Sequence, residues 1–124
     1  MKTIYLTSVL VVLAASMSFA KRLAPPDVPP IRTEGAIFSV PHFAGGERDQ
    51  NGGFVEARHP KTKKLLWRVQ VYKTTYDKTL EKDVQDVFIR SLSFDQVHGL
   101  LILSDERGRM FVLNPKTKKV TKVS

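Results

Sequence analysis

The chain is most constrained by a strictly alternating stretch that follows a basic turn at residues 60–64. Beyond the turn the odd positions are apolar, namely Leu65, Trp67, Val69 and Val71. Arg68 and Gln70 between them are polar. Successive side chains of a strand point to opposite faces, so this pattern predicts a half-buried β-strand that carries the single tryptophan of the chain.

Short strand-like runs recur through the rest of the chain. They lie at residues 36–40, 54–58, 87–94, 100–103, 109–113 and 119–123, separated by turns that contain glycine, proline or asparagine. Residues 73–86 predict one or two helical turns, because Leu80, Val84 and Val87 have helical spacing. We therefore expect a mainly β fold, a small antiparallel meander or sandwich of about seven short strands with at most one short helix.

The expected core follows from the apolar side of each strand. The all-apolar run 100–103 predicts a central strand that is covered on both faces. Alternation places Phe88, Leu92 and Phe94 on one face of their strand and Ile89 on the other. Trp67→Ala is expected to be the most damaging single change, costing about 3–5 kcal/mol if the ring is buried. The core residues expected are Phe54, Leu65, Trp67, Val69, Val71, Phe88, Ile89, Leu92, Leu101, Leu103, Phe111 and Leu113.

The first part of the chain predicts export. Residues 1–20 combine a basic start at Lys2 with an apolar run and a small-residue cleavage site at Ala20, which is typical of a signal peptide. An uncleaved anchor is the alternative, but a membrane span needs about 20 predominantly apolar residues. Residues 21–32 are rich in proline and predict an exposed leader, and residues 33–124 a single β-rich domain. The expected location is periplasmic or secreted.

Composition limits the chemistry. The chain has no cysteine, which excludes disulfides, thiolate metal sites and a lipid-carrying cysteine. Its formal net charge is +8, which favours an acidic partner or surface. Neither a basic helix nor exposed aromatics among the basic residues is evident, so no specific nucleic-acid recognition is expected. The lysines proposed to contact an anionic partner are Lys61, Lys63, Lys64, Lys116, Lys118 and Lys119, although lysines also keep turns soluble and blunt sheet edges.

No established catalytic motif is present. Residues 44–53 form a glycine-rich stretch that predicts a surface loop without a phosphate-binding pattern. His42, His59 and His98 occur in or beside separate turns, which predicts surface histidines, and no pair has zinc-ligand spacing. We expect no cofactor and no metal. The carboxylates of Asp83 and Asp86 lie three residues apart and, with His98, are the best candidates for a hydrolase or metal-dependent enzyme.

The sequence also contains an internal repeat. The five residues Pro60 to Lys64 recur without change as Pro115 to Lys119, 55 positions later, and both copies lie between an apolar strand and an alternating one. A duplicated hairpin explains this identity. Convergence on a favourable turn sequence is the alternative.

The segments 54–67 and 101–120 that contain these turns resemble the repeats of quinoprotein-type (PQQ-like) β-propellers. In those repeats a short strand precedes an Asp-x-x-Thr-Gly turn and a tryptophan. Here His59 and Asn114 replace the aspartate, Lys63 and Lys118 replace the glycine, and the second copy lacks the tryptophan. The resemblance implies blade-like hairpins but no quinone site, because a ring needs typically four or more four-stranded blades and the chain is expected to supply fewer than two.

Three functions follow from these expectations. The first is an exported non-catalytic binding or protein-interaction module that uses a sheet face, a lysine-rich turn or an open strand edge. The second is the small hydrolase or metal-dependent enzyme built on Asp83, Asp86 and His98. The third is a structural protein that assembles with copies of itself, since pieces of a propeller leave strand edges unpaired.

Overall fold

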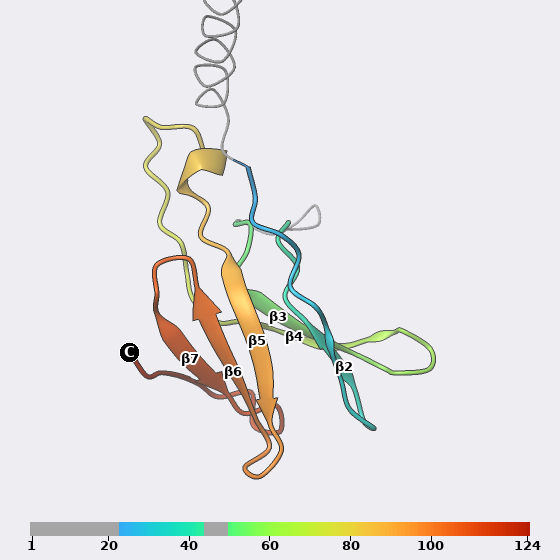
Figure 1. Cartoon of the computed structure of the whole chain (residues 1–124). Helices are drawn as coiled ribbons and strands as arrows, with labels where there is room; N and C mark the ends of the chain where they lie inside the picture. Colours follow the sequence, from blue (N-terminus) through green and yellow to red (C-terminus); the bar gives the residue numbers. More distant parts are fainter. Residues whose placement is uncertain (1–22, 44–49) are drawn as a thin grey trace, which may run out of the picture.

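The protein is an all-β molecule built from two four-stranded antiparallel sheets (Figure 1). A computed structural model describes residues 23–43 and 50–124. The first sheet contains β1 (Ile31–Arg32), β2 (Ile37–Ser39), β3 (Phe54–Arg58) and β4 (Leu65–Gln70). The second contains β5 (Ile89–Asp95), β6 (Leu100–Asp105), β7 (Met110–Leu113) and β8 (Val120–Lys122). The mainly β prediction is confirmed.

Each sheet is a simple meander in which every strand pairs with the next one along the chain. The strands predicted from sequence are all present, and the additional one is β1, which begins two residues before the expected domain boundary at Thr33. The eight strands of the described residues form two four-stranded sheets. The predicted signal peptide at residues 1–20 lies outside the described residues.

The core lies between the two sheets. Phe38 of the first sheet and Phe94 of the second stack with ring centroids 6.2 Å apart. Leu101, Leu103 and Leu113 of the second sheet have no exposed surface. Most of the predicted core residues are buried, and the additional buried apolar residues include Ala36, Phe38, Val40, Val55, Ala57, Tyr72 and Val87.

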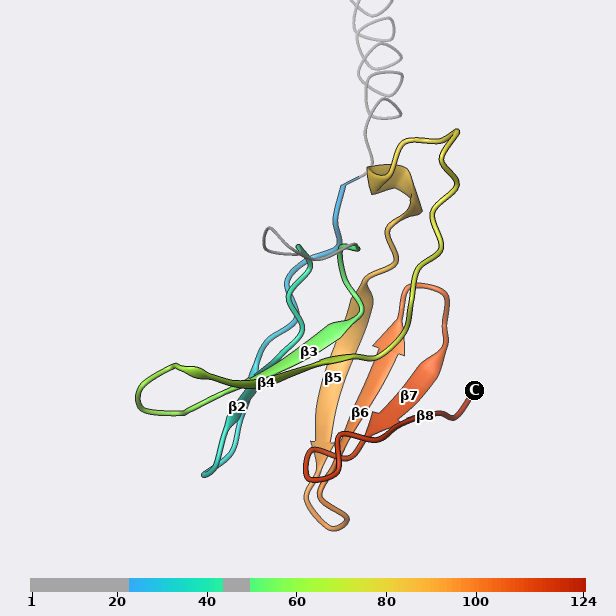
Figure 2. The same ribbon diagram turned by 180° about the vertical axis from the view of Figure 1, so that it is seen from behind.

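Strand β4 is more exposed than its pattern predicted. Leu65 is 40% exposed, and Trp67 and Val69 are only partly buried against the core. The β3–β4 hairpin extends sideways beyond the second sheet, so its outer half has no layer above it (Figures 1 and 2). The expectation that Leu65 belongs to the core is therefore wrong, and Trp67 and Val69, also expected in the core, pack against it but remain partly exposed.

The central strand β6 is likewise covered on one face only. Leu101 and Leu103 are fully buried, whereas Leu100 and Ile102 on the other face are partly exposed. The expectation of cover on both faces is wrong because each sheet has a single neighbouring layer within the part of the chain that is described.

The predicted helix within residues 73–86 is reduced to one 3-10 turn, η1 (Asp83–Gln85). Leu80 and Val84, which were expected to form an apolar helical face, are 58% and 45% exposed. The segment is held instead by Gln85, whose amide nitrogen donates to the carbonyls of Asp77, Leu80 and Glu81. These bonds replace the backbone pairing that a longer helix would supply.

The end of the glycine-rich stretch is buried and not a surface loop. Gln50 is 3% exposed, and its amide nitrogen donates to the carbonyls of Gly52 and Tyr72 at 3.0 and 2.9 Å. Its side-chain oxygen accepts from the backbone of Thr74 at 2.7 Å. Gln50 thereby ties the start of β3 to the end of β4. Residues 44–49 of the predicted loop lie outside the described residues.

The two copies of the repeated turn have the same position and the same geometry. One joins β3 to β4 and the other joins β7 to β8. The side chains of His59 and Asn114 each accept hydrogen bonds from the two amides that follow the proline. Lys63 and Lys118 have φ angles of 66° and 62°, the only positive values among the non-glycine residues described. The turn is therefore duplicated in structure as well as in sequence.

Replacing Lys63 or Lys118 by glycine is expected to stabilise the protein by about 0.5–1 kcal/mol each. A left-handed backbone conformation costs a non-glycine residue about 1–2 kcal/mol, and glycine avoids this cost. Glycine also loses more conformational entropy on folding, so only part of the gain in stability remains. Urea unfolding measures the change. Lys61→Gly, in the same turn but without a positive φ, is the control and should destabilise the protein.

Candidate ligand-binding cleft

A hollow lies between the two sheets, at the end where the β1–β2 turn faces the β7–β8 turn. Its volume is about 370 Å³. Three aromatic side chains dominate the lining: Phe38 lies 5.9 Å from Trp67 and 6.2 Å from Phe94, measured between ring centroids. The lining residues are Thr33, Gly35, Ala36, Phe38, Leu66, Trp67, Phe94, Gly99, Pro115 and Lys116.

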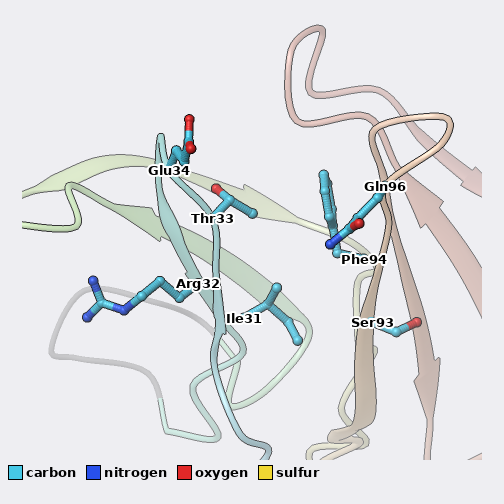
Figure 3. A pocket seen from close by; sticks show the side chains of 7 residues that line it. All are labelled: Ile31, Arg32, Thr33, Glu34, Ser93, Phe94 and Gln96. Atoms are coloured by element: carbon cyan, nitrogen blue, oxygen red, sulfur yellow. The ribbon is translucent and has the colours of Figure 1, made fainter.

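A second hollow, of about 810 Å³, continues from the first along the strands β1 and β5 (Figure 3). The two hollows share Thr33 and Phe94, so we treat them as one cleft. Figure 3 shows Ile31 and Thr33 turned toward Ser93 and Phe94, whereas Arg32 points away. The remaining lining residues are Glu34 and Gln96.

Lysines from the second copy of the repeated turn border the aromatic end of the cleft. Lys116 lines the hollow, and the Nζ atom of Lys118 lies 5.7 Å from the centroid of the Trp67 ring. This is a cation–π distance, and it keeps the ammonium group beside the apolar surface. Of the lysines proposed from sequence, these two belong to the cleft.

The other lysines proposed from sequence lie elsewhere. Lys61, Lys63 and Lys64 occupy the β3–β4 turn and line neither hollow, and the Lys63 ammonium donates to the carbonyl of Pro60 in the same turn. Lys119 is exposed outside the lining. Two turns of identical sequence thus have different surroundings, and only the second is next to an apolar hollow.

The structure does not bring together the acidic and histidine residues proposed for an enzyme. Asp86 precedes β5 and His98 follows it, and a seven-residue strand spans about 23 Å. His98 pairs instead with Asp95 at 2.8 Å, which lowers the pKa of that carboxyl. Within the described residues, no group of three or more histidine, aspartate or glutamate side chains has a metal-binding arrangement.

Asp86 has a structural partner set. It is 4% exposed and accepts from the Tyr76 hydroxyl at 2.6 Å and from the Asn51 amide at 3.1 Å. Asp83 lies on the exposed turn η1. Asp86 therefore anchors the 73–86 segment to the start of the first sheet's β3.

His42 differs from the predicted surface histidine. It is 5% exposed, its Nε2 atom lies 3.0 Å from the carbonyl oxygen of Pro26, and its ring lies 4.9 Å from that of Phe88. The contact holds part of the proline-rich leader against the domain. His59 acts within its turn as described above, and His98 is exposed as predicted.

The Tyr76–Asp86 bond predicts a loss of stability in alkali. Burial, followed by this hydrogen bond, raises the pKa of Tyr76 from 10.0 to about 12. The folded protein therefore retains a proton that the unfolded chain releases, so this contribution is complete below pH 10 and is lost as the pH rises toward 12. The urea midpoint should decrease less between pH 9 and pH 11 for Tyr76→Phe than for the unchanged protein. Equal decreases would contradict the assignment of this effect to Tyr76.

Comparison of the chain with protein-family models, with curated proteins and with solved structures finds no match in any of the three. Within residues 23–43 and 50–124 no helix has the length and hydrophobicity needed to cross a membrane. The class of the protein is therefore defined by its fold alone, a small domain of two antiparallel four-stranded sheets with an aromatic cleft between them.

Proposed function

We propose that the protein is an exported, non-catalytic binding module whose cleft takes an extended acidic polypeptide segment with an apolar or aromatic anchor. The observation that carries this proposal is the aromatic group Phe38, Trp67 and Phe94, bordered by Lys116 and Lys118. The rings of Trp67 and Phe94 are partly exposed and can supply apolar contact area, and the buried Phe38 ring packs against both. The lysines select acidic neighbours of the anchor.

The strand edges beside the cleft favour an extended ligand. Within the described residues β1 hydrogen-bonds only to β2, and β5 only to β6, so one backbone edge of each strand faces away from its own sheet. The larger hollow runs along these two strands. An added strand obtains affinity from main-chain hydrogen bonds and specificity from pockets for its alternate side chains. Here the aromatic hollow is the pocket.

The charge around the cleft favours an acidic ligand. Lys116 of the lining and Lys118 beside Trp67 outnumber the one acidic lining residue, Glu34, whereas the Arg32 side chain points away from the cleft. The chain as a whole carries a formal charge of +8, which increases the rate of encounter with acidic partners at low salt. Binding should therefore weaken as ionic strength rises.

The single tryptophan provides the test, because any ligand in the aromatic hollow contacts it. The probes are two eight-residue peptides, one alternating glutamate with phenylalanine and valine, and one with lysine in place of glutamate. Titration is followed by Trp67 fluorescence and independently by calorimetry. Saturable binding of the acidic peptide alone is expected. Equal binding of both peptides, or binding of neither, would overturn the proposal.

The repeated turn supplies a matched control for the charge contribution. The double variant Lys116→Gln with Lys118→Gln is expected to weaken binding of the acidic peptide about three- to tenfold, as for the loss of two exposed charge contacts. The double variant Lys61→Gln with Lys63→Gln removes the same charges from an identical turn outside the cleft. It should change binding by less than about twofold. Equal effects of the two variants would indicate attraction by net charge and not by the cleft.

A further inference from the structure

The internal repeat relates the two sheets residue by residue. Superposing the two turns matches Ala57 of β3 with Val112 of β7, since the offset is 55 positions. Phe38 lies opposite Ala57, and Ile102 lies opposite Val112. Phe38 in β2 therefore corresponds to Ile102 in β6, and the correspondence extends across both sheets.

This correspondence shows how the sheets are stacked. Phe38 and Ala57 are 5% and 0% exposed, because they lie on the face of the first sheet that the second sheet covers. Their counterparts Ile102 and Val112 lie on the face of the second sheet that points away from the first, opposite to Leu101 and Leu103. The two sheets therefore lie one behind the other in the same orientation. The outer face of the second sheet corresponds to the face of the first sheet that the second sheet covers.

The outer face of the second sheet is almost uncharged. Within the strands, its charged residues lie at the two ends of β5, as Arg90 and Asp95, and alternation from Thr121 places Lys119 at its border. The Ser91 and Ser104 hydroxyls hydrogen-bond to each other, so these polar groups keep a partner when water is removed. The residues of this face are Ser91, Ser93, Leu100, Ile102, Ser104, Met110, Val112 and Thr121.

The outer face of the first sheet has the opposite character. By register it carries Arg32, Arg58 and Arg68 around a single carboxylate, Glu56. Glu56 pairs with Arg68 at 2.6 Å and with Arg58 at 3.5 Å. Burying this positive group against an uncharged sheet costs desolvation energy without compensation. A further layer is therefore disfavoured on this side of the stack, as with the polar outer face of a capping repeat.

We propose that the outer face of the second sheet is the interface between two copies of this chain, related by a two-fold axis. Of the two outer faces only this one can meet itself without burying unpaired charge, and a two-fold dimer brings identical faces together. The face measures about 19 by 20 Å from strand spacing and rise, or roughly 400 Å² per copy. Standard interfaces bury about 800 Å² per partner, so the dimer should be weak and dependent on concentration.

Sedimentation velocity of the full chain over a range from micromolar to near-millimolar concentration tests the interface. The unchanged protein should shift from monomer to dimer, and Ile102→Lys should raise the dissociation constant at least about tenfold because two lysines meet across the axis. Thr121→Lys, at an exposed position of the same face, covers the case in which Ile102→Lys fails to fold. Gln70→Lys, on the arginine-bearing face, is the matched control and should leave the dimer unchanged.

Two results would overturn the interface: a monomer at every concentration, or a dimer that persists in Ile102→Lys and Thr121→Lys alike. A dimer that Gln70→Lys disrupts would place the contact on the other sheet and also overturn it. The peptide-binding response of Trp67 should be the same in Ile102→Lys as in the unchanged protein, since Trp67 and the aromatic hollow lie on the other side of the sheet, and only Ser93 of the edge strand β5 borders both the cleft and the outer face. Failure of the dimer and failure of the cleft are thereby separate outcomes.

Discussion

Replacing Asp105 by alanine is expected to lower the free energy of unfolding by about 3–5 kcal/mol, the cost of removing one partner from a buried ion pair. Asp105 is 2% exposed. Its Oδ1 atom accepts from the backbone nitrogens of Arg107 and Arg109 at 3.0 and 2.9 Å, and its Oδ2 atom accepts from the Arg109 side chain at 2.6 Å. One carboxylate therefore satisfies two backbone amides and a guanidinium group.

The arginine partner makes the loss larger. The Arg109 guanidinium lies 4.8 Å from the centroid of the Tyr72 ring, and Tyr72 stacks on Phe111 at 5.5 Å. Without Asp105 this charge remains in contact with aromatic surface and has lost its counter-ion. The effect should therefore extend from the β6–β7 turn to the packing between the sheets.

Urea unfolding at neutral pH measures this prediction. Asp105→Asn keeps an acceptor for the backbone amides but not the charge, so its cost should lie between those of the unchanged protein and Asp105→Ala. Asp83→Ala, on the exposed turn η1, is the control and should remain within about 0.5 kcal/mol of the unchanged protein. A loss below about 1 kcal/mol for Asp105→Ala would contradict the buried pairing.

The hairpins of this fold are predictable because their turns are specified locally. The turns at 59–64, 104–108 and 114–119 contain glycine, proline or asparagine next to alternating strands, and all three form as predicted. The same turn sequence adopts the same backbone twice, including a positive φ at Lys63 and Lys118. The mainly β class and most of the core follow from these hairpins.

Features set by packing between distant segments were not predictable in this way. A register shift between Ile89 and Ser91 breaks the alternation of β5, so Ile89 and Leu92 are both buried where opposite faces were expected. The one or two helical turns expected within 73–86 are reduced to the single 3-10 turn η1, where Gln85 hydrogen-bonds three carbonyls of the same segment. The spacing of apolar residues along the sequence indicates neither a register shift nor the hydrogen bonds of a single side chain.

The cleft illustrates the same limit. Trp67 was expected in the core because alternation identifies the apolar face of β4, but alternation does not indicate how far the next layer extends. The lysines of the two turns are identical in sequence, and only the stacking of the sheets distinguishes Lys116 and Lys118 from Lys61 and Lys63. The lysines were therefore identified as a group, and the cleft itself was missed.

The second large effect is expected at Gly52, which the sequence suggested was part of a surface loop. Its φ is +74°, and a β-carbon at this position would lie 2.7 Å from the carbonyl oxygen of Val87 and 2.9 Å from the Phe88 ring. The first of these contacts is with backbone, so it is not relieved by a change of side-chain rotamer. Gly52→Ala should cost about 2–5 kcal/mol, the sum of left-handed strain and overpacking.

Gly108 provides a closely matched comparison for that prediction. Its φ is +77°, but no atom lies within 4 Å of the position that a β-carbon would occupy. Gly108→Ala therefore measures the backbone strain by itself, about 1–2 kcal/mol. The difference between the two variants in urea unfolding isolates the contact between residue 52 and the Val87–Phe88 segment. Equal losses of stability would mean that residue 52 is not in close contact with the Val87–Phe88 segment. Residues 50–53 would then not connect the first sheet to the segment that precedes β5.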